Sequence, residues 1–259
     1  IFVKNIVIIT GSLGLIGMES AKFFLRKKYK VIGIDNDMRN YFFGMSVNKN
    51  KKILKSSFNN YTHLDLDIRN KIQIENLFKF YKNKICLIIH CAAQPSHDWA
   101  TKNPHVDFEI NANGTLNLLT AFQKNTPKSV FIFMSTNKVY GDRSNSDLNF
   151  VEKKMRYELI TSHKYYNYGI PETFSIDQSK HSLFGVSKAS ADLMVQEFGR
   201  YYNLKTVVFR GGCLTGPLHK GAELHGFLSY LLRCNILGKK YYVKGYKGKQ
   251  VRDNIHSAD

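Results

Sequence analysis

One short run of glycines constrains the fold of this chain more than any other feature. The apolar stretch IVIIT at 6–10 leads directly into TGSLGLIG, whose glycines have the spacing GxxGxxG, and then into a segment of helical period. Such glycines permit a tight turn, a close approach of backbone to a pyrophosphate, and close packing of helix on strand. The pattern predicts a dinucleotide site at a strand–turn–helix unit, and a plain cluster of turn glycines is the alternative. The residues of the predicted turn are Gly11, Gly14, Leu15, Ile16 and Gly17.

The rest of the chain alternates short apolar runs with longer segments of helical period. The runs predict strands at 6–10, 30–35, 61–66, 85–91, 129–135 and 205–210. The longer segments predict helices at 15–28, 70–83, 106–124, 183–202 and 223–238. This order predicts an α/β fold, a doubly wound parallel sheet with helices on both faces.

The predicted elements divide the chain into two parts. We expect residues 1–214 to form a Rossmann domain that binds a dinucleotide, with 142–180 as a polar, tyrosine-rich loop system over the site. Residues 215–259 begin a smaller, substrate-binding domain. The stretch 36–60 fits neither strand nor helix clearly.

The net charge of +18 is spread along the chain. Its densest cluster, NKNKKILK at 48–55, is predicted to be a solvated loop, although a phosphate-bearing partner is the alternative. Because no aromatic residues interleave with these lysines, we expect no nucleic-acid partner. No apolar run is long enough for a membrane span, so no membrane partner is expected. The cysteines form no CxxC pair, which predicts reduced thiols, no metal site and a cytoplasmic location.

The ends of the second and third predicted strands offer contacts to an adenosine. Asp35 follows the second strand, where a carboxylate can accept from both ribose hydroxyls and would repel a 2′-phosphate, so NAD is favoured over NADP. Asn36 adjoins it. After the third strand, Asp67 and Ile68 are predicted to hold the adenine edge, but a helix N-cap region leading to Asn70 accounts for the same residues equally well.

The fourth and fifth predicted strands end in residues suited to a nicotinamide and a sugar. The small Ala92 and Ala93 would let a cofactor lie on the backbone at the carboxyl edge of the sheet. The hydroxyls of Ser135 and Thr136 could bind the alcohol or ketone of a substrate, although such a pair is also common in turns. The neighbouring residues predicted to bind the substrate are Gln94, Ser96 and Asn137.

These motifs occur in the same order as in a known family. The chain resembles the extended short-chain dehydrogenase/reductases, and within them the nucleotide-sugar epimerases of the CDP-tyvelose (CDP-paratose) 2-epimerase type. The resemblance covers nearly the whole chain and rests on TGSLGLIG, LDIR, FEINANGTLNLL, STNKVYGD, LKTVVFR and GKQVRDNIH. It implies NAD as cofactor and a nucleotide sugar as substrate. It also implies that the end of the substrate domain lies beyond this sequence.

The resemblance assigns the central chemistry to a threonine, a tyrosine and a lysine. Thr136 would polarise the reacting oxygen, and Lys188 would bind the nicotinamide ribose and lower the pKa of a tyrosine four residues earlier. That position holds Phe184, which has no proton to exchange. A solvated surface lysine is the alternative for Lys188. The proton could instead move through Thr136 and a water, through a desolvated Lys188, or through a loop tyrosine: Tyr165, Tyr166 or Tyr168.

The resemblance also separates epimerases from the related sugar 4,6-dehydratases. The dehydratases carry an Asp-Glu pair directly after the catalytic threonine, and this chain has Asn137 and Lys138 there. Arg252 would grip the pyrophosphate with its guanidinium fork, or else pair with Asp253 at the surface. Asn111 and Arg210 are predicted to contact the cofactor. His225 is predicted to shape the sugar pocket, and a histidine that is simply packed or solvated at a helix start is the alternative.

Two predicted helices, 106–125 and 182–203, carry long apolar faces. By resemblance they would pair in a homodimer, although covering the sheet is a sufficient reason for such faces. Three functions stay open: an NAD-dependent 2-epimerase of a CDP-sugar acting by transient oxidation to a keto sugar, another dehydrogenase or epimerase of the same family, and a non-catalytic NAD-binding protein, which Phe184 makes conceivable.

Overall fold

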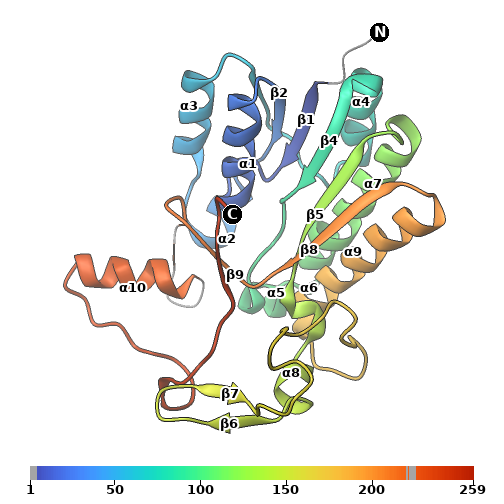
Figure 1. Ribbon diagram of the computed structural model, residues 1–259. Coiled ribbons are helices and arrows are strands. Elements are labelled where there is room, and N and C mark those ends of the chain that lie inside the picture. The colour runs from blue at the N-terminus through green and yellow to red at the C-terminus, as the bar shows by residue number, and fades with distance from the viewer. Residues whose placement is uncertain (1–4, 220, 222–225) are drawn as a thin grey trace.

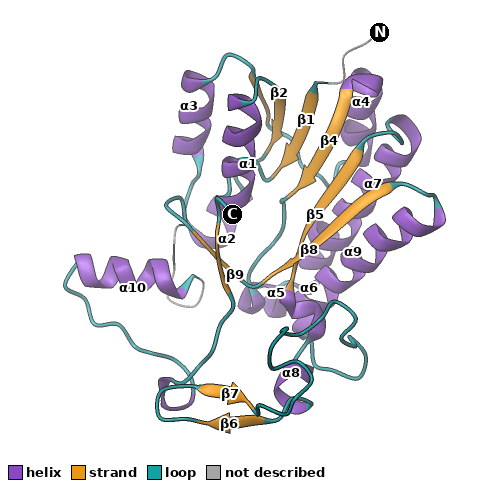
Figure 2. Ribbon diagram, in the orientation of Figure 1, coloured by secondary structure: helices purple, strands orange, loops and turns teal. Residues whose placement is uncertain are grey.

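The centre of the molecule is a parallel sheet, shown in Figures 1 and 2. The computed structural model describes residues 5–219, 221 and 226–259. Within them the strand order of the main sheet is β3-β2-β1-β4-β5-β8, so the direction of strand addition reverses between β1 and β4. The strands are β1 (Ile6–Thr10), β2 (Lys30–Ile34), β3 (Tyr61–Leu64), β4 (Ile85–His90), β5 (Val130–Thr136) and β8 (Lys205–Gly211).

Neighbouring strands of this sheet are parallel throughout, and each predicted strand forms within one or two residues of its predicted bounds. The reason is that β1, β2 and β4 are almost continuously apolar, as strands covered on both faces must be. The predicted fold class is therefore confirmed. A ligand in such a sheet binds at the carboxyl ends of the strands, where the order reverses.

Helices cover the two faces of the sheet unequally. One face carries α4 (Lys71–Tyr81), α7 (Gly114–Asn125) and α9 (Ser182–Tyr201), whose core includes Phe78, Leu118, Phe122 and Val195. The other carries α1 (Leu15–Arg26) and α3 (Asn48–Ser57), as Figure 1 shows. The larger cluster takes in residues of β1, β2, β4 and β5, with Val208 of β8 packed against it, so it extends under most of the width of the sheet.

The region 36–60 contains helices that the sequence did not indicate. The lysine cluster at 48–55 is not a loop, because it lies in the helix α3, and a short helix α2 (Met38–Phe43) precedes it. Only Asn50 and Leu54, one turn apart, are buried on α3. With so narrow an apolar stripe the periodicity is weak, which accounts for the wrong prediction.

The segment predicted as one helix at 106–124 consists of three parts. It begins as α6 (Pro104–Phe108), continues as a π-helical turn η2 (Glu109–Asn113) and ends as α7. A π turn adds one residue to a helix and is frequent at functional sites. Near the carboxyl end of the chain, α10 (Phe227–Ile236) is shorter than predicted in the part that the structure describes.

The loop system at 142–180 has secondary structure of its own. It contains the short helix α8 (Arg143–Ser146) and the hairpin of β6 (Phe150–Glu152) and β7 (Tyr157–Leu159). Beyond the main sheet, β9 (Cys213–Thr215) pairs in parallel with β10 (Asn254–His256). This pairing brings the segment after β8 beside the segment that carries Arg252.

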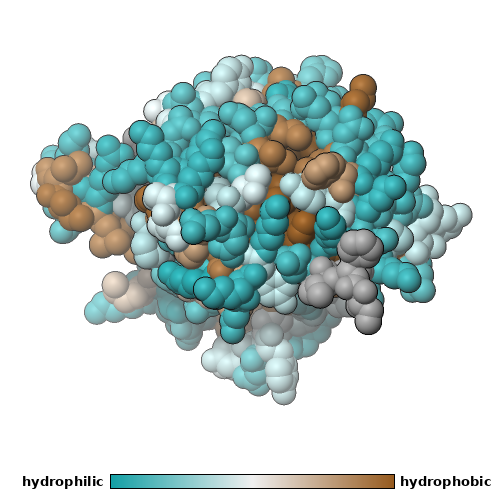
Figure 3. All heavy atoms as spheres, turned by 90° about the horizontal axis from the view of Figure 1, so that it is seen from above, coloured by the Kyte–Doolittle hydropathy of each residue, from teal (hydrophilic) through white to brown (hydrophobic). Residues whose placement is uncertain are grey.

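The surface is mainly hydrophilic in the view from above (Figure 3), with an apolar group over α10 at its left rim. The exposed apolar residues of that helix are Phe227, Leu231, Leu232 and Ile236. Among the described residues, no helix is both long and apolar enough to cross a membrane.

Candidate functional site

The turn after β1 has no room for side chains at two of its glycines. Gly11 has a φ of +65°, and a Cβ there would lie 2.7 Å from the backbone nitrogen of Ala92. A Cβ on Gly17 would lie 2.1 Å from the carbonyl oxygen of Gly11. Glycine is therefore required at both positions by the close approach of backbone segments.

The amino end of α1 is open to an anion. Its N-cap is Gly14, and no side chain caps the first turn. The free N–H groups and the helix dipole both favour a phosphate there. A small pocket over this turn is lined by Gly14, Leu15, Arg39, Asn50 and His219, among others. The tight glycine turn, the open end of α1 and the guanidinium of Arg39 match the shape and charge of a pyrophosphate. The residues present therefore fit a dinucleotide.

Asp35 lies at the end of β2, against the glycine turn. Its carboxylate accepts hydrogen bonds from the backbone N–H groups of Leu13 and Asp37, both at 2.9 Å. Burial raises the pKa of Asp35 above its usual value, and the two backbone bonds oppose that rise. Each oxygen keeps a second lone pair, so the carboxylate can still accept from ribose hydroxyls.

Asp67 and Ile68 lie beside this ribose position. Asn36 donates to Asp67 at 3.0 Å, and Arg69 binds the same carboxylate in a bidentate pair with a shortest distance of 2.6 Å. Ile68 is buried against Gly114. Asn70 caps α4 by accepting from the Gln73 N–H. The predicted N-cap is confirmed, and contact between Asp67 or Ile68 and an adenine stays a prediction.

The end of β4 is fixed by a buried histidine. His90 lies between the hydroxyls of Thr10, at 2.6 Å, and Thr115, at 2.9 Å. Burial lowers the pKa of His90 to about 3, so its ring is neutral. Thr10 also accepts from the Ala92 N–H. This clamp holds Ala92 and Ala93 at the sheet edge, next to Gly11.

The π turn places an amide at the centre of a buried network. Asn111 donates to Asp107 and Ser187, both at 3.0 Å, and accepts from the Gln94 N–H at 2.9 Å. Gln94 in turn donates to Asp107 at 2.7 Å and holds the backbone of Ser96. The structure thus places Asn111 and Gln94 inside the protein, where they join α9 to the loop after β4.

Ser135 and Arg210 meet at a second buried carboxylate. Ser135 donates to Asp192 at 2.6 Å, and Arg210 forms a bidentate pair with Asp192 at 3.0 Å. Arg210 also donates to the hydroxyl of Tyr140 and to the carbonyl of Glu172. Its fork therefore joins β8, α9 and the loop system, and the pKa of Arg210 rises above its usual range mainly through the bonds to Asp192.

Lys188 is a buried lysine, so the alternative of a solvated surface residue is wrong. Its side chain is 4% exposed, and Nζ donates to the carbonyl of Met134 at 2.8 Å, 4.2 Å from the ring centre of Phe133. Burial lowers the pKa of Lys188 to about 8. Since Met134 lies two residues before Thr136, the ammonium and the threonine occupy the same end of β5.

Phe184 lies one turn before Lys188 and is only 7% exposed. Its ring packs against the imidazole of His97, with the ring centres 4.7 Å apart. His97 begins the short helix α5 (His97–Lys102), which follows the loop after β4. A histidine therefore stands beside the ring that replaces the expected tyrosine.

The turn after β5, η3 (Asn137–Tyr140), gathers positive charge. Thr136 accepts from the Lys138 N–H at 3.2 Å. Burial lowers the pKa of Lys138, and the nearby guanidinium of Arg252 lowers it further. Arg252 is exposed and donates to Gln250. The turn after β5 therefore carries a half-buried ammonium, and the charge of Arg252 acts on it.

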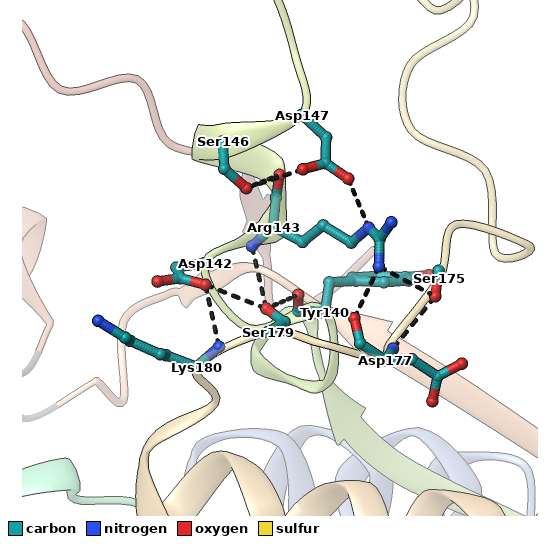
Figure 4. A network of polar contacts seen from close by, with 9 residues as sticks. All are labelled: Tyr140, Asp142, Arg143, Ser146, Asp147, Ser175, Asp177, Ser179 and Lys180. Atoms are coloured by element: carbon teal, nitrogen blue, oxygen red, sulfur yellow. Dashed lines mark hydrogen bonds and ion pairs between the residues drawn. The ribbon is translucent and has the colours of Figure 1, made fainter.

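The loop system is tied to the start of α9, as Figure 4 shows. Asp142 accepts from the Lys180 N–H at 3.0 Å, and Ser179 donates to the Tyr140 carbonyl at 3.0 Å. Arg143 binds the carbonyl of Asp177 at 2.7 Å. These contacts connect the segment just after β5 to the segment just before Phe184, so the two walls of the site are held together.

Among the described residues, no ring contact joins one of the loop tyrosines to Phe184. Tyr165 packs its ring against Phe174, and Tyr168 is 91% exposed. Tyr166 is also exposed. His225 lies outside the described residues.

Three functional candidates were not found from the sequence: His97, Asp192 and Lys138, the last noted only as a departure from the dehydratases. Asp192 lies on the buried face of α9, four residues after Lys188, and a carboxylate there signals a buried partner. His97 gave no such signal, because its neighbour in space is 87 residues away in the sequence. Among the described residues, no three His, Cys, Asp or Glu side chains form a group that could hold a metal.

Comparison with known proteins agrees with this geometry, in which a glycine turn, the carboxylate of Asp35 and the pair of Thr136 and Lys188 lie along one edge of the sheet. Residues 7–259 match the model of the NAD dependent epimerase/dehydratase family, and the chain belongs to that family. NAD is thus its cofactor, as the sequence predicted.

The relatives fall into more than one activity. The chain is 33% identical over 258 residues to the CDP-paratose 2-epimerase of Salmonella typhi, covering 98% of this chain and 71% of that protein. It is 28% identical to the dTDP-glucose 4,6-dehydratase of Salmonella typhimurium, covering 98% of this chain and 65% of the relative. The family thus includes both epimerases and dehydratases of sugar nucleotides.

Solved structures share the fold. Pal from Bacillus thuringiensis superposes with a TM-score of 0.75 at 24% identity, covering 98% of this chain and 70% of that one. The UDP-glucose 4-epimerase of Thermus thermophilus, solved in complex with NAD, has a TM-score of 0.71 at 23% identity, covering 98% and 71%.

Proposed function

We propose that this protein is an isomerase, an NAD-dependent nucleotide-sugar epimerase that acts at C2 of a CDP-sugar of the paratose/tyvelose type. The observation that carries the proposal is the position of Lys188, whose Nζ lies 2.8 Å from the Met134 carbonyl at the end of β5. This places a buried cation beside Thr136, where a nicotinamide ribose and a sugar hydroxyl would meet. The identity of 33% to a CDP-paratose 2-epimerase supports the choice of sugar.

The cofactor supplies a reversible acceptor of hydride when it is bound. The chain's own residues do the rest: Gly11, Gly14 and Gly17 give the pyrophosphate room, and Asp35 accepts from the ribose. Lys188 would donate to the ribose of the nicotinamide. Thr136 donates to the sugar oxygen whose bond order changes during oxidation and so stabilises it.

Epimerisation fits the site better than dehydration. Elimination of water needs an acid and a base next to the sugar, and Asn137 with Lys138 occupies the positions where the dehydratases carry Asp-Glu. Lys138 is half-buried with a lowered pKa, which suits binding of an anion. Oxidation followed by reduction from the opposite face needs no such pair.

The substrate's diphosphate would lie between Lys138 and Arg252. The pairing of β10 with β9 brings the segment of Arg252 beside the segment that follows β8, the neighbour of β5, and the guanidinium lowers the pKa of Lys138. An anion between them would relieve their repulsion. We also propose that Ser96 and Asn137 contact the sugar.

One alternative has a specific observation in its favour. A non-catalytic NAD-binding protein would account for Phe184, since the ring fills the position of the expected phenol and is buried. Another epimerase or a dehydrogenase of the family is the second alternative, supported by the range of activities among the relatives.

The test is turnover by purified protein. We expect tightly retained NAD after purification and, with CDP-paratose and no added cofactor, a new set of sugar proton signals at C2 in NMR. A non-catalytic protein would retain NAD and leave the spectrum unchanged. A dehydrogenase would change the spectrum only with NAD in stoichiometric amounts.

We also propose a homodimer formed through α6, η2, α7 and α9. Leu183, Val186 and Leu193 of α9 and Phe108 of α6 are exposed apolar residues. The first three follow helical spacing and so lie on one face, turned away from the sheet. A second copy of the chain would cover them.

A further inference from the structure

The residue that exchanges the substrate's hydroxyl proton is missing from the position where a tyrosine is expected. We propose that His97 takes that role, with Nε2 as the atom that accepts and returns the proton. This inference rests on the proposed epimerase function and names a residue that the family resemblance does not supply. It starts from the contact between the imidazole of His97 and the ring of Phe184 at 4.7 Å.

The orientation of His97 is set by one hydrogen bond. Its Nδ1 lies 2.8 Å from the hydroxyl of Ser182, at the start of α9. When Nδ1 carries the proton and donates it to Ser182, Nε2 has a free lone pair. Within residues 5–219, 221 and 226–259, Nε2 makes no hydrogen bond, so it is available to a ligand.

The surroundings keep the ring neutral. Burial lowers the pKa of His97, the ammonium of Lys138 lowers it further, and Asp98 partly offsets both. The helices packed against α5 are α9, which contributes the uncharged Ser182 and Phe184, and α6, which carries His105 and Asp107. The charges that act on His97 are those of Lys138 and Asp98. A neutral imidazole near pH 7 is the form that can accept a proton.

The other candidates are less suitable. Tyr166 and Tyr168 are solvent-exposed and Tyr165 packs against Phe174, and among the described residues none of the three makes a ring contact with Phe184. Lys188 donates to the carbonyl of Met134 in β5, and the proposed function assigns it to the nicotinamide ribose. Among the described residues, His97 is the titratable group whose ring contacts Phe184.

The step is a reversible proton transfer coupled to oxidation. The O–H bond of the sugar would break and its proton would go to Nε2 of His97, while NAD, when bound, would supply the acceptor for the hydride from the same carbon, so that a ketone forms. After the keto sugar has rotated in the site, the hydride would return to its opposite face and the imidazolium of His97 would return the proton to the oxygen. No net oxidant is consumed.

The first experiment compares two histidine variants of the full chain. His97→Asn keeps an amide that can bond to Ser182 but cannot exchange a proton, and His105→Asn, an exposed histidine on α6, is the matched control. We expect kcat for CDP-paratose to fall about 10²- to 10⁴-fold in the first variant with KM nearly unchanged. The control should keep wild-type activity.

Rescue separates proton exchange from packing. Adding Phe184→Tyr to His97→Asn provides a phenol one turn from Lys188, and kcat should recover by about tenfold or more. If the double variant stays as slow as His97→Asn while retaining NAD and its folded spectrum, or if His97→Asn alone is fully active, the inference is wrong. Wild-type protein without turnover overturns the epimerase function itself, and His97's role with it.

A second readout does not depend on turnover. The imidazole Cε1–H signal of His97, assigned through His97→Asn, should titrate below the ordinary histidine pKa and shift when CDP is replaced by CDP-paratose. An unmoved signal, with binding of the nucleotide sugar verified by calorimetry, would contradict contact between His97 and the sugar.

Discussion

Lys188 illustrates how one buried charge links stability to pH. Its folded pKa of about 8 lies below the ordinary value of 10.5, because burial disfavours the ammonium. The folded state therefore releases the proton at a lower pH than the unfolded state. Stability is lowered below pH 8 and recovers as the pH rises toward 10.5.

We predict that Lys188→Met reveals this dependence. Relative to the variant, cofactor-free wild-type protein should gain about 3 kcal/mol of unfolding free energy between pH 8 and 10.5. Denaturant titrations of both proteins at several pH values across this range measure the difference. A difference that stays constant with pH would mean that the folded lysine keeps its ordinary pKa.

Phe184→Tyr tests the neighbouring position. The ring keeps its shape, and the added hydroxyl lies one turn from Lys188, so epimerase activity should be retained or raised. The C2 proton of the sugar, followed by NMR, gives the rate. Complete loss of activity would mean that the hydroxyl disturbs the packing against His97.

Residue roles were predictable where a local pattern carries them. Gly11, Gly17 and Asp35 follow from spacing after a strand, and the structure places them together. His97, Ser135 and Arg210 could not be placed, because their partners come from other elements: Phe184 and Ser182 for the first, and Asp192 for the other two. Pairings of this kind depend on the packing of α5, α9 and β8.

At the scale of elements, the strand–turn–helix unit of β1 and α1 depends on Gly17. In Gly17→Ala the added methyl would meet the Gly11 carbonyl oxygen at 2.1 Å, so the turn must open. We expect loss of retained NAD, measured by absorbance of the denatured protein's supernatant. Gly44→Ala is the control: its φ of +62° strains an alanine and costs some stability, but nothing lies within 4 Å of the added methyl, so NAD should be retained. Equal NAD content in both variants would contradict this role of the glycine turn.

The contact of β8 with α9 depends on the pair of Arg210 and Asp192. Asp192 is 1% exposed, so Arg210→Met leaves a buried carboxylate without its cation, at a cost of about 3–5 kcal/mol. Arg200→Met, in the exposed last turn of α9, is the control and should cost little. Thermal unfolding measures both. A large loss of NAD affinity with unchanged Tm would instead make Arg210 a cofactor ligand.

The elements themselves were predictable to different degrees. Strands of the main sheet were found because short, continuous apolar runs between polar segments are typical of strands that are buried on both faces. Helix α3 was missed because its buried stripe consists of Asn50 and Leu54 among lysines. The hairpin of β6 and β7 was missed because neither three-residue strand is long enough to show alternation.

At the scale of the whole molecule, the exposed stripe on α9 predicts the oligomeric state. Leu193→Glu should convert the proposed dimer into a monomer, because a charge would be buried in an apolar interface. Light scattering after size-exclusion chromatography gives the mass. Ile236→Glu on α10, equally apolar and more exposed, is the control; a wild-type monomer, or a dimer split by the α10 variant, would contradict the proposed surface.

The π turn between α6 and α7 lets one helix serve two regions, the buried polar network and the apolar core. A π turn accommodates an extra residue locally, so Leu118 and Phe122 beyond it keep their places against the sheet while Asn111 within it faces Asp107 and Ser187. Deleting one residue of the turn would close it to a regular helix and leave Leu118 and Phe122 in place, but it would remove or turn the amide that joins α9 to the loop after β4. The irregularity of this helix is thus a requirement of the buried polar network and not of the apolar core.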